Sequence, residues 1–132
     1  MDARAFITIG MSAERILDVT PDITVRHFVP TMPAVYATPM MIMAMEMTSV
    51  DAIAAVLPPG FVTVGTEVDI RHLAATPVGR RVRTTARVIA VERKVIRFEV
   101  EAFDGDRRIG EGRHGRGLVN VASFTRRLEA GE

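Results

Sequence analysis

A single carboxylate, Glu46, stands between two methionines on an otherwise apolar stretch of the chain. Burying a carboxylate without a partner costs free energy, so this residue either lies on a narrow exposed edge or belongs to a functional site. Ionisable side chains in apolar surroundings gather at active sites, which favours the functional interpretation. Asp51, the other acid in the stretch, is better explained as a solvated residue or as a contact between subunits.

Two more residues, His72 and Thr38, could supply a base and a hydroxyl. His72 ends a run of alternating apolar and polar side chains, so its imidazole is expected on the apolar face of a strand. A histidine there is a core residue about as often as a catalytic one. Thr38 precedes Pro39 and has a sufficient role as a helix cap, although the same helix start gathers amides that could hold an oxyanion. His27 and His114 carry less weight, because neither lies on a clean alternating face.

The spacing of Thr38 and Glu46 constrains any site that uses both. On one helix they are separated by roughly 12 Å along the axis and by about 80° around it. One helix therefore cannot present both groups closely to one small substrate. A site that combines them would be shared between two subunits.

Composition excludes several kinds of chemistry. The 132 residues contain no Cys, which excludes a thiolate nucleophile and a Cys-ligated metal, and we expect neither a metal nor a bound cofactor. The net charge of +1 and the 5% of aromatic residues argue against nucleic acid as a partner. The glycine-rich residues 110–117 are better explained by a bending strand than by a phosphate loop. No apolar signal segment follows Met1, and polar residues interrupt residues 40–57, so a cytoplasmic protein without a membrane span is expected.

A helix and a loop must position these candidate residues. The helix is expected over residues 39–57, because Thr38-Pro39 starts it and Pro58-Pro59-Gly60 stops it. Its surface is apolar almost all round, so other parts of the structure must cover it. Residues 30–37 contain two prolines and are expected to form a lid-like loop before the helix.

Strands are expected on either side of the helix, with an early one near residues 12–20 and a meander over residues 61–121. The expected buried faces are Val62, Val64, Thr66, Val68, Ile70 and His72, then Val82, Thr84, Ala86, Val88 and Ala90, then Ile96, Phe98, Val100 and Ala102. Residues 25–29 either extend the early strand or lead into a loop, and residues 122–132 are expected to be a short polar terminus. A long apolar helix wrapped by an antiparallel sheet is an α+β arrangement and describes a single domain with the hotdog fold.

The sequence also resembles the fluoroacetyl-CoA thioesterase family, a branch of the hotdog thioesterases. The resemblance is collinear over most of the chain, which makes it far more specific than any single motif. It rests on Thr24-Val25-Arg26-His27, on Thr38 eight residues before Glu46, on Gly65-Thr66 seven residues before His72, on His72-Leu73-Ala74-Ala75-Thr76-Pro77-Val78-Gly79, on Ala102-Phe103-Asp104-Gly105 and on Ile109-Gly110-Glu111-Gly112.

The resemblance implies an acyl-CoA thioesterase whose catalytic residues are Thr38, Glu46 and His72. It implies that the Gly65 amide lies near the acyl group and that Arg116 lies near the pocket entrance. It also implies a homodimer with sites at the subunit interface, and CoA as part of the substrate. In the corresponding mechanism His72, held or charged by Glu46, is the base, while Thr38 and nearby amides stabilise the oxyanion. A covalent route through Glu46 or Thr38 stays open.

The lid is where this chain departs from the family. The specialist enzyme has a longer lid that is rich in Phe, whereas residues 28–37 here contribute only Phe28 and Tyr36 as aromatic residues. We expect these two side chains to contact the substrate, without strict selection for a fluorinated acyl group. Two alternatives remain, a hotdog hydratase or dehydratase acting on enoyl-CoA and a non-catalytic acyl-CoA sensor or binding module.

Overall fold

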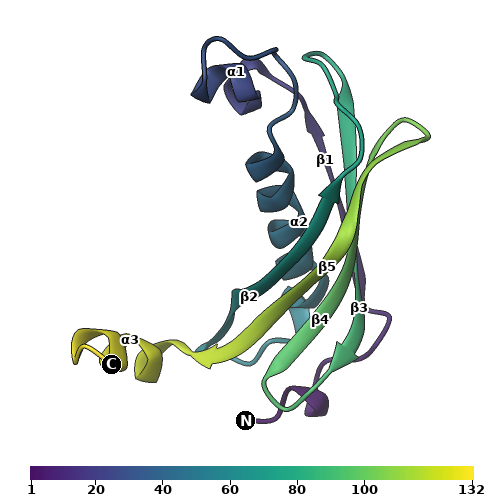
Figure 1. The fold of residues 1–132 in the computed structure, drawn as a ribbon. Coiled ribbons are helices and arrows are strands. Elements are labelled where there is room, and N and C mark those ends of the chain that lie inside the picture. Colours follow the sequence, from purple (N-terminus) through teal and green to yellow (C-terminus); the bar gives the residue numbers. More distant parts are fainter.

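An antiparallel sheet of five strands bends around one long helix, which lies on its concave side (Figure 1). The computed structural model describes residues 1–132. The strands are β1 (Ser12–Asp18), β2 (Phe61–His72), β3 (Arg81–Val91), β4 (Val95–Asp104) and β5 (Arg107–Asn120). The helices are α1 (Val25–Phe28), α2 (Thr38–Ile53) and α3 (Val121–Glu129), and the 3-10 turns are η1 (Ala3–Ala5), η2 (Pro21–Ile23) and η3 (Ala54–Val56). This is the α+β arrangement that the sequence predicts.

The core lies between α2 and the concave face of the middle strands β3 and β4, with a smaller contribution from β5. The strands follow the order β1-β3-β4-β5-β2, so β1 and β2 are the edges. Because α2 packs mainly against β1 and β3, the concave face over β5 and β2 has little of the helix above it. The largest fully buried apolar side chains are Tyr36, Phe98, Met41, Met45, Ile53, Ile96 and Ile109.

The predicted strand faces hold for the middle of the sheet and fail at one edge. On β3 and β4 the even-numbered residues from Val82 to Val88 and from Ile96 to Ala102 are buried, as the alternation predicts. On β2 the predicted buried face is wrong within one chain, because Val62 is 42% exposed and Val68 is 48% exposed. β2 is an edge strand, and a register shift between Gly65 and Glu67 interrupts its alternation.

The start of α2 differs from its prediction. Ala37 has the extended backbone of an N-cap residue, and no side chain caps the helix, so the predicted capping role of Thr38 is wrong. Thr38 is instead the first helical residue, followed by Pro39. At the other end, η3 carries the helical path on to Val56. By length and composition this helix could cross a membrane, but the core helix of a soluble protein passes the same test.

The two sides of α2 have different surroundings. Met41, Ala44 and Met45 are buried against the sheet. On the outward side Met43 is 52% exposed and Met47 is 36% exposed. The single chain therefore covers only part of the apolar surface that the sequence predicts must be covered.

The glycines of β5 bring that strand close to its neighbours. A Cβ atom at Gly110 would lie 2.5 Å from the Met41 sulfur, so the absence of a side chain lets α2 approach. A Cβ atom at Gly112 would meet the backbone carbonyl of Asp69 on β2. Close approach of a neighbouring element, a common reason for glycine within a strand, occurs at both positions.

Two segments near the ends of the chain differ from their predictions. The residues from Val25 to Phe28 form the short helix α1 where a strand or loop was expected. The polar terminus forms the helix α3, which was not predicted. The Asn120 side chain caps it by accepting a hydrogen bond of 3.0 Å from the Ser123 amide. In Figure 1, α3 projects away from the end of the sheet.

Candidate active site

The first cluster of polar side chains joins the start of α2 to the end of β2. Thr38 Oγ1 lies 2.7 Å from His72 Nδ1, and the direction of this hydrogen bond depends on the tautomer of the ring. His72 Nε2 is buried and has no hydrogen-bond partner in the chain. Burial lowers the pKa of His72 below its ordinary value, and the nearby backbone of Ala74 acts in the opposite direction. The ring is therefore neutral at neutral pH and able to accept a proton.

An apolar cavity of about 480 Å³ lies beside Thr38 and His72. The segment before α2 and the residues that follow β2 form its walls, which are Val25, Met32, Val35, Tyr36, Ala37, Thr38, Pro39, His72, Leu73, Ala74 and Ala75. A mainly apolar lining with two reactive polar groups is typical of a small-molecule site.

The two predicted aromatic contacts have different positions. Tyr36 lines the cavity, is almost fully buried, and has its ring 6.5 Å from the His72 ring in an edge-to-face arrangement. Burial raises the pKa of Tyr36 to about 12, so its hydroxyl stays protonated. Phe28 is 57% exposed and is not among the residues that line the cavity.

Glu46 belongs to a second cluster, on the side of α2 that faces β2 and β5. Its Oε1 atom lies 3.2 Å from Arg116 Nη1 and 3.6 Å from His114 Nε2. A Cβ atom at Gly65 would collide with the same Oε1, so a side chain there would force the carboxylate to move. Glu46 is therefore not an unpartnered carboxylate on an exposed edge, because its side chain is only 29% exposed and has a cationic partner.

Arg116 is the most extensively bonded side chain of this cluster. Its Nε donates to Thr63 Oγ1 and its Nη2 donates to the Thr63 carbonyl, both at 2.8 Å. Nη1 donates to Glu46 Oε1 at 3.2 Å and contacts His114 Nε2 at 3.1 Å. Burial lowers the pKa of Arg116 and Glu46 raises it, but a guanidinium remains charged in proteins. Arg116 lies beside Glu46 and does not line the cavity next to His72, whereas the sequence placed it near the pocket entrance.

The two clusters lie far apart within one chain. We call them the Thr38–His72 pair and the Glu46 cluster, the latter consisting of Glu46, Thr63, Gly65, His114 and Arg116. Gly65 and His72 are seven residues apart on β2, which corresponds to roughly 20 Å at the rise of a strand. One chain thus holds two partial sites that do not meet.

Sequence reasoning missed Thr63 and His114. His114 and Arg116 are two residues apart on β5, so their side chains share the concave face of the sheet. That spacing was a usable signal, but the glycines around them hide the alternation of apolar and polar residues.

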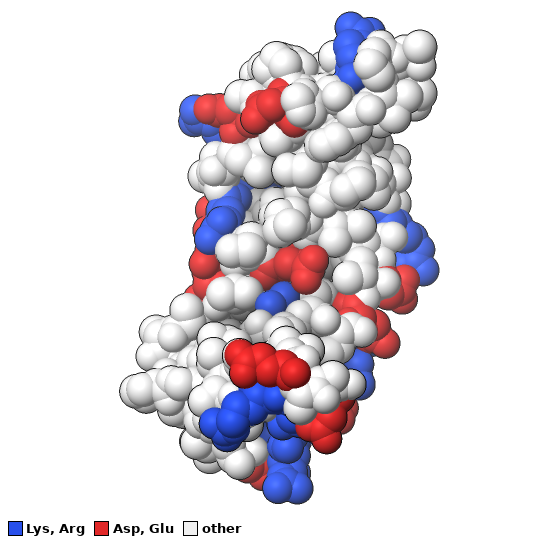
Figure 2. Space-filling view, turned by 90° about the vertical axis from the view of Figure 1, so that its left-hand side faces the viewer, with Lys and Arg blue, Asp and Glu red and all other residues white.

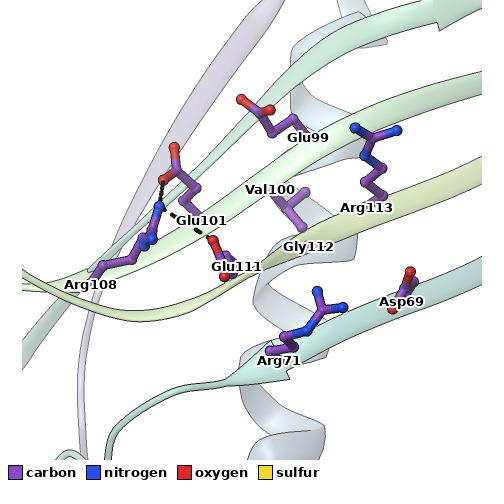
Figure 3. Close-up of a pocket in the computed structure, with 9 residues that line it drawn as sticks. All are labelled: Asp69, Arg71, Glu99, Val100, Glu101, Arg108, Glu111, Gly112 and Arg113. Carbon is purple, nitrogen blue, oxygen red and sulfur yellow. Dashed lines mark hydrogen bonds and ion pairs between the residues drawn. The ribbon is translucent and has the colours of Figure 1, made fainter.

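A larger hollow of about 520 Å³ on the outer face of the sheet is not a comparable site. Figure 3 shows that charged side chains of β2, β4 and β5 surround it, and Val100 is its single apolar residue. Arg108 pairs with Glu101 and with Glu111, each at 3.3 Å. Mixed charges that neutralise one another across neighbouring strands are typical of a solvated sheet face.

Comparisons with known proteins connect this geometry to a family. Residues 19–122 match the family described as fluoroacetyl-CoA-specific thioesterase. The fluoroacetyl-CoA thioesterase of Streptantibioticus cattleyicolor is 37% identical over 116 residues, which are 83% of this chain and 84% of that protein. The solved structure of the fluoroacetyl-CoA thioesterase FlK has a TM-score of 0.88 at 33% identity, over 96% of this chain and 98% of that chain. A hot-dog-like protein from Thermanaerovibrio acidaminovorans has a TM-score of 0.90 at 23% identity, over 98% of this chain and 96% of that chain, which shows the fold alone.

The fold and these matches define the class of the protein as a hotdog thioesterase, a hydrolase that acts on acyl-CoA thioesters. A thioesterase superfamily member from Thermus thermophilus is also similar, with a TM-score of 0.86 at 33% identity over 94% of each chain. The chain belongs to the family of fluoroacetyl-CoA-specific thioesterases. The fold, enzyme class and family predicted from the sequence are confirmed.

Proposed function

We propose that two copies of this chain form the active site together and that it hydrolyses small acyl-CoA thioesters. In each site the Thr38–His72 pair of one subunit faces the Glu46 cluster of the partner subunit. The observation that carries this proposal is the separation of the two clusters along both α2 and β2. The Thr38–His72 pair has no carboxylate. In the Glu46 cluster His114 is 2% exposed and its Nε2 contacts Arg116, so this imidazole is not free to act as the base.

The uncovered surfaces of the chain support a dimer. β2 is a long edge strand, and an exposed edge is a liability that proteins normally cover. Val62 and Val68 are exposed on this strand, and Met43 and Met47 are exposed on α2. Figure 2 shows that much of the surface on this side of the molecule carries no charge, with a few acidic and basic groups at its middle and more of them toward its lower end. A second copy of the chain would bury these apolar groups.

The same surfaces suggest how the two copies pair. An antiparallel pairing of β2 with its own copy has a two-fold axis, as most homodimers do. If the axis passes next to Val68, His72 of one subunit lies opposite Gly65 of the partner subunit. In that register the Thr38–His72 pair lies next to the partner's Glu46. Glu46 is near that point of the strand because its carboxylate lies beside Gly65 of its own chain.

In the proposed reaction a neutral His72 takes a proton from the attacking water. The water oxygen bonds to the thioester carbonyl carbon, and negative charge develops on the carbonyl oxygen. The Thr38 hydroxyl and the positive end of α2 stabilise this charge. The carbon–sulfur bond then breaks, and the CoA sulfur takes the proton that His72 holds. Glu46 of the partner subunit orients His72 and stabilises its charged form.

The cavity beside His72 supports a small acyl group. Its apolar lining includes Met32, Val35 and Tyr36 from the segment before α2. Tyr36 is the single aromatic side chain that this segment contributes, so we propose a preference for short acyl groups without strict selection for fluoroacetyl. A panel of acetyl, fluoroacetyl, short branched, aromatic and long-chain CoA thioesters tests this, with released CoA as the readout. Enoyl-CoA consumption without CoA release would identify a hydratase, and binding without turnover would identify a sensor.

Mixing two inactive variants tests the shared site. His72→Ala and Glu46→Gln each remove one half of every site. Because a two-fold interface is the same on both subunits, a mixed dimer has one site that carries both mutations and one intact site. Half of the dimers in a random mixture are mixed, so the mixture would regain about a quarter of the wild-type activity. If each chain held a complete site, mixing would restore no activity. Two differently tagged copies of the wild-type protein, mixed and then purified through one tag, are the control for subunit exchange.

A further inference from the structure

His114 is a buried histidine that lies inside the Glu46 cluster and has no role in the reaction as proposed above. It comes from the middle of β5 and is 2% exposed. Its ring stacks on Phe98 of β4, with 6.3 Å between the ring centroids. A fully buried imidazole with two polar nitrogens needs a partner for each of them, because an unsatisfied polar atom is costly in the interior.

The contacts of His114 determine its tautomer. Nδ1 lies 2.8 Å from the backbone carbonyl of Glu67, which can only accept a hydrogen bond, so Nδ1 carries a proton. Nε2 of the neutral ring is then an acceptor. Arg116 Nη1, at 3.1 Å, donates to it.

This acceptor fixes the position of the Glu46 carboxylate through Arg116. The guanidinium is rigid and planar, so bonds to Thr63 and to His114 hold it in one orientation. In that orientation Nη1 reaches both His114 and Glu46 Oε1. Oε1 also lies close to Gly65, where an added Cβ atom would collide with it.

The groups around His114 show what its protonation would do. α2 contributes Glu46 and β5 contributes Arg116, while β2 contributes only the Glu67 carbonyl, since the Glu67 side chain pairs with Arg97. The facing group from β4 is Phe98, which has no charge. A proton on Nε2 would face the N–H groups of Arg116 at 3.1 Å. The charged ring would displace Arg116 and attract Glu46, whose Oε1 is 3.6 Å from Nε2.

We propose that His114 is a positioning residue that acts as a neutral acceptor for Arg116 and thereby holds Glu46 in its working position. The proposal rests on the proposed role of Glu46 in thioester hydrolysis. It also makes the position of Glu46 dependent on the protonation state of a second histidine besides His72. Burial and the Arg116 charge lower the pKa of His114, with the Glu67 carbonyl and Glu46 acting in the opposite direction, so the neutral form is present at neutral pH.

Two amide variants separate the acceptor from the rest of the ring. In His114→Gln the terminal carbonyl occupies the place of Nε2 and can accept from Arg116, but it does not titrate. In His114→Asn the terminal amide occupies the place of Nδ1 and can donate to Glu67, but it does not reach Arg116. We expect His114→Asn to lower kcat by about 10-fold to 100-fold with little change in KM, and His114→Gln to recover most of that loss.

The pH profile gives a readout that a purely structural role would not change. Wild-type kcat should fall steeply on the acid side because His72 and His114 both titrate, and the fall should be shallower in His114→Gln. The matched control is His27→Gln, which removes an exposed histidine and should leave the profile unchanged. Equal kcat in His114→Asn and wild type, or an unchanged acid limb in His114→Gln, would overturn the role of His114.

A measurement without turnover separates this inference from the proposed function. The ¹⁵N shifts of the His114 ring in the resting protein should show a proton on Nδ1 and a bare Nε2, whether or not substrate is present. The opposite tautomer or a charged ring at neutral pH would overturn the inference even in an active enzyme. If wild type hydrolyses no thioester in the panel, the proposed function fails and the positioning role fails with it. If wild type is active and His114→Asn matches it, only the role of His114 fails.

Discussion

The Thr38–His72 pair and the Glu46 cluster differ in how completely their polar atoms are bonded. His72 has one partner, Thr38, and a buried nitrogen with none. In the Glu46 cluster the Arg116 side chain bonds to Thr63, His114 and Glu46. The first cluster has groups that are free to bind a substrate, and the second has a charge fixed in place. Reactive groups and rigid support are thus built at different ends of β2, and the enzyme needs both.

The largest expected effect comes from removing the base at the incompletely bonded cluster. His72→Ala should lower kcat by about 1,000-fold, because general base catalysis contributes on the order of 100-fold to 10,000-fold. Thioesterase assays with released CoA measure it, and His27→Ala is the control. A loss smaller than tenfold in a folded variant would mean that His72 is not the base.

A smaller loss is expected when the rigid cluster is distorted and its charges are kept. Gly65→Ala places a Cβ atom against Glu46 Oε1, so the carboxylate must move. We expect kcat to fall by about 100-fold, because a displacement of about 1 Å has an effect of that order. Gly117→Ala is a matched control, since its Cβ would lie 3.3 Å from Thr66 Cγ2 and would contact no residue of either cluster. Equal activity in both variants would contradict the fixed position of Glu46.

The two clusters share a dependence of stability on pH. Burial lowers the pKa of both His72 and His114 below 6.5, so below that pH the unfolded chain binds more protons than the folded one. The stability that these two histidines contribute is therefore fully present above pH 6.5 and is lost as the pH falls from there through the folded pKa. The slope is at most about 1.4 kcal/mol per pH unit for each proton. Thermal unfolding from neutral to mildly acidic pH should show this slope, and His114→Gln should reduce it; an identical slope in the variant would count against a neutral His114.

The smallest effect is expected on the outer face of the sheet, where charges are also paired but exposed to solvent. Arg108→Ala removes contacts with Glu101 and Glu111. Exposed ion pairs contribute little, so the free energy of unfolding should change by less than about 1 kcal/mol. kcat should match wild type. A large loss of activity would mean that the outer hollow takes part in substrate binding.

Much of the fold could be predicted from the sequence because the middle strands have a strict period of two. The buried faces follow it from Val82 to Val88 and from Ile96 to Ala102, and the prediction fails at Ala90, which lies after a register shift and is only half-buried. The prediction fails on β2, where Val62 and Val68 are apolar but exposed in one chain. Periodicity reports that a residue prefers burial, and it does not say which subunit covers it.

The candidate site was only partly accessible to sequence reasoning. Eight residues along α2 were enough to show that Thr38 and Glu46 point to different places. The contact of Thr38 with His72 joins residues 34 positions apart, and local pattern gives no sign of it. The capping role assigned to Thr38 failed because the helix begins one residue earlier than a cap at Thr38 requires. His114 was set aside because its glycine neighbours obscure the strand period, although its spacing from Arg116 places both on one face.

The separation of Thr38 and Glu46 along α2 has a consequence for kinetics at high dilution. If every site takes its base from one chain and its carboxylate from another, a dissociated chain has no activity. At enzyme concentrations well below the dissociation constant of the dimer, the observed rate then varies with the square of the total protein concentration. At concentrations above that constant it varies linearly. For such an enzyme, the amount of protein in the cell sets how much of it is active as well as how much of it there is.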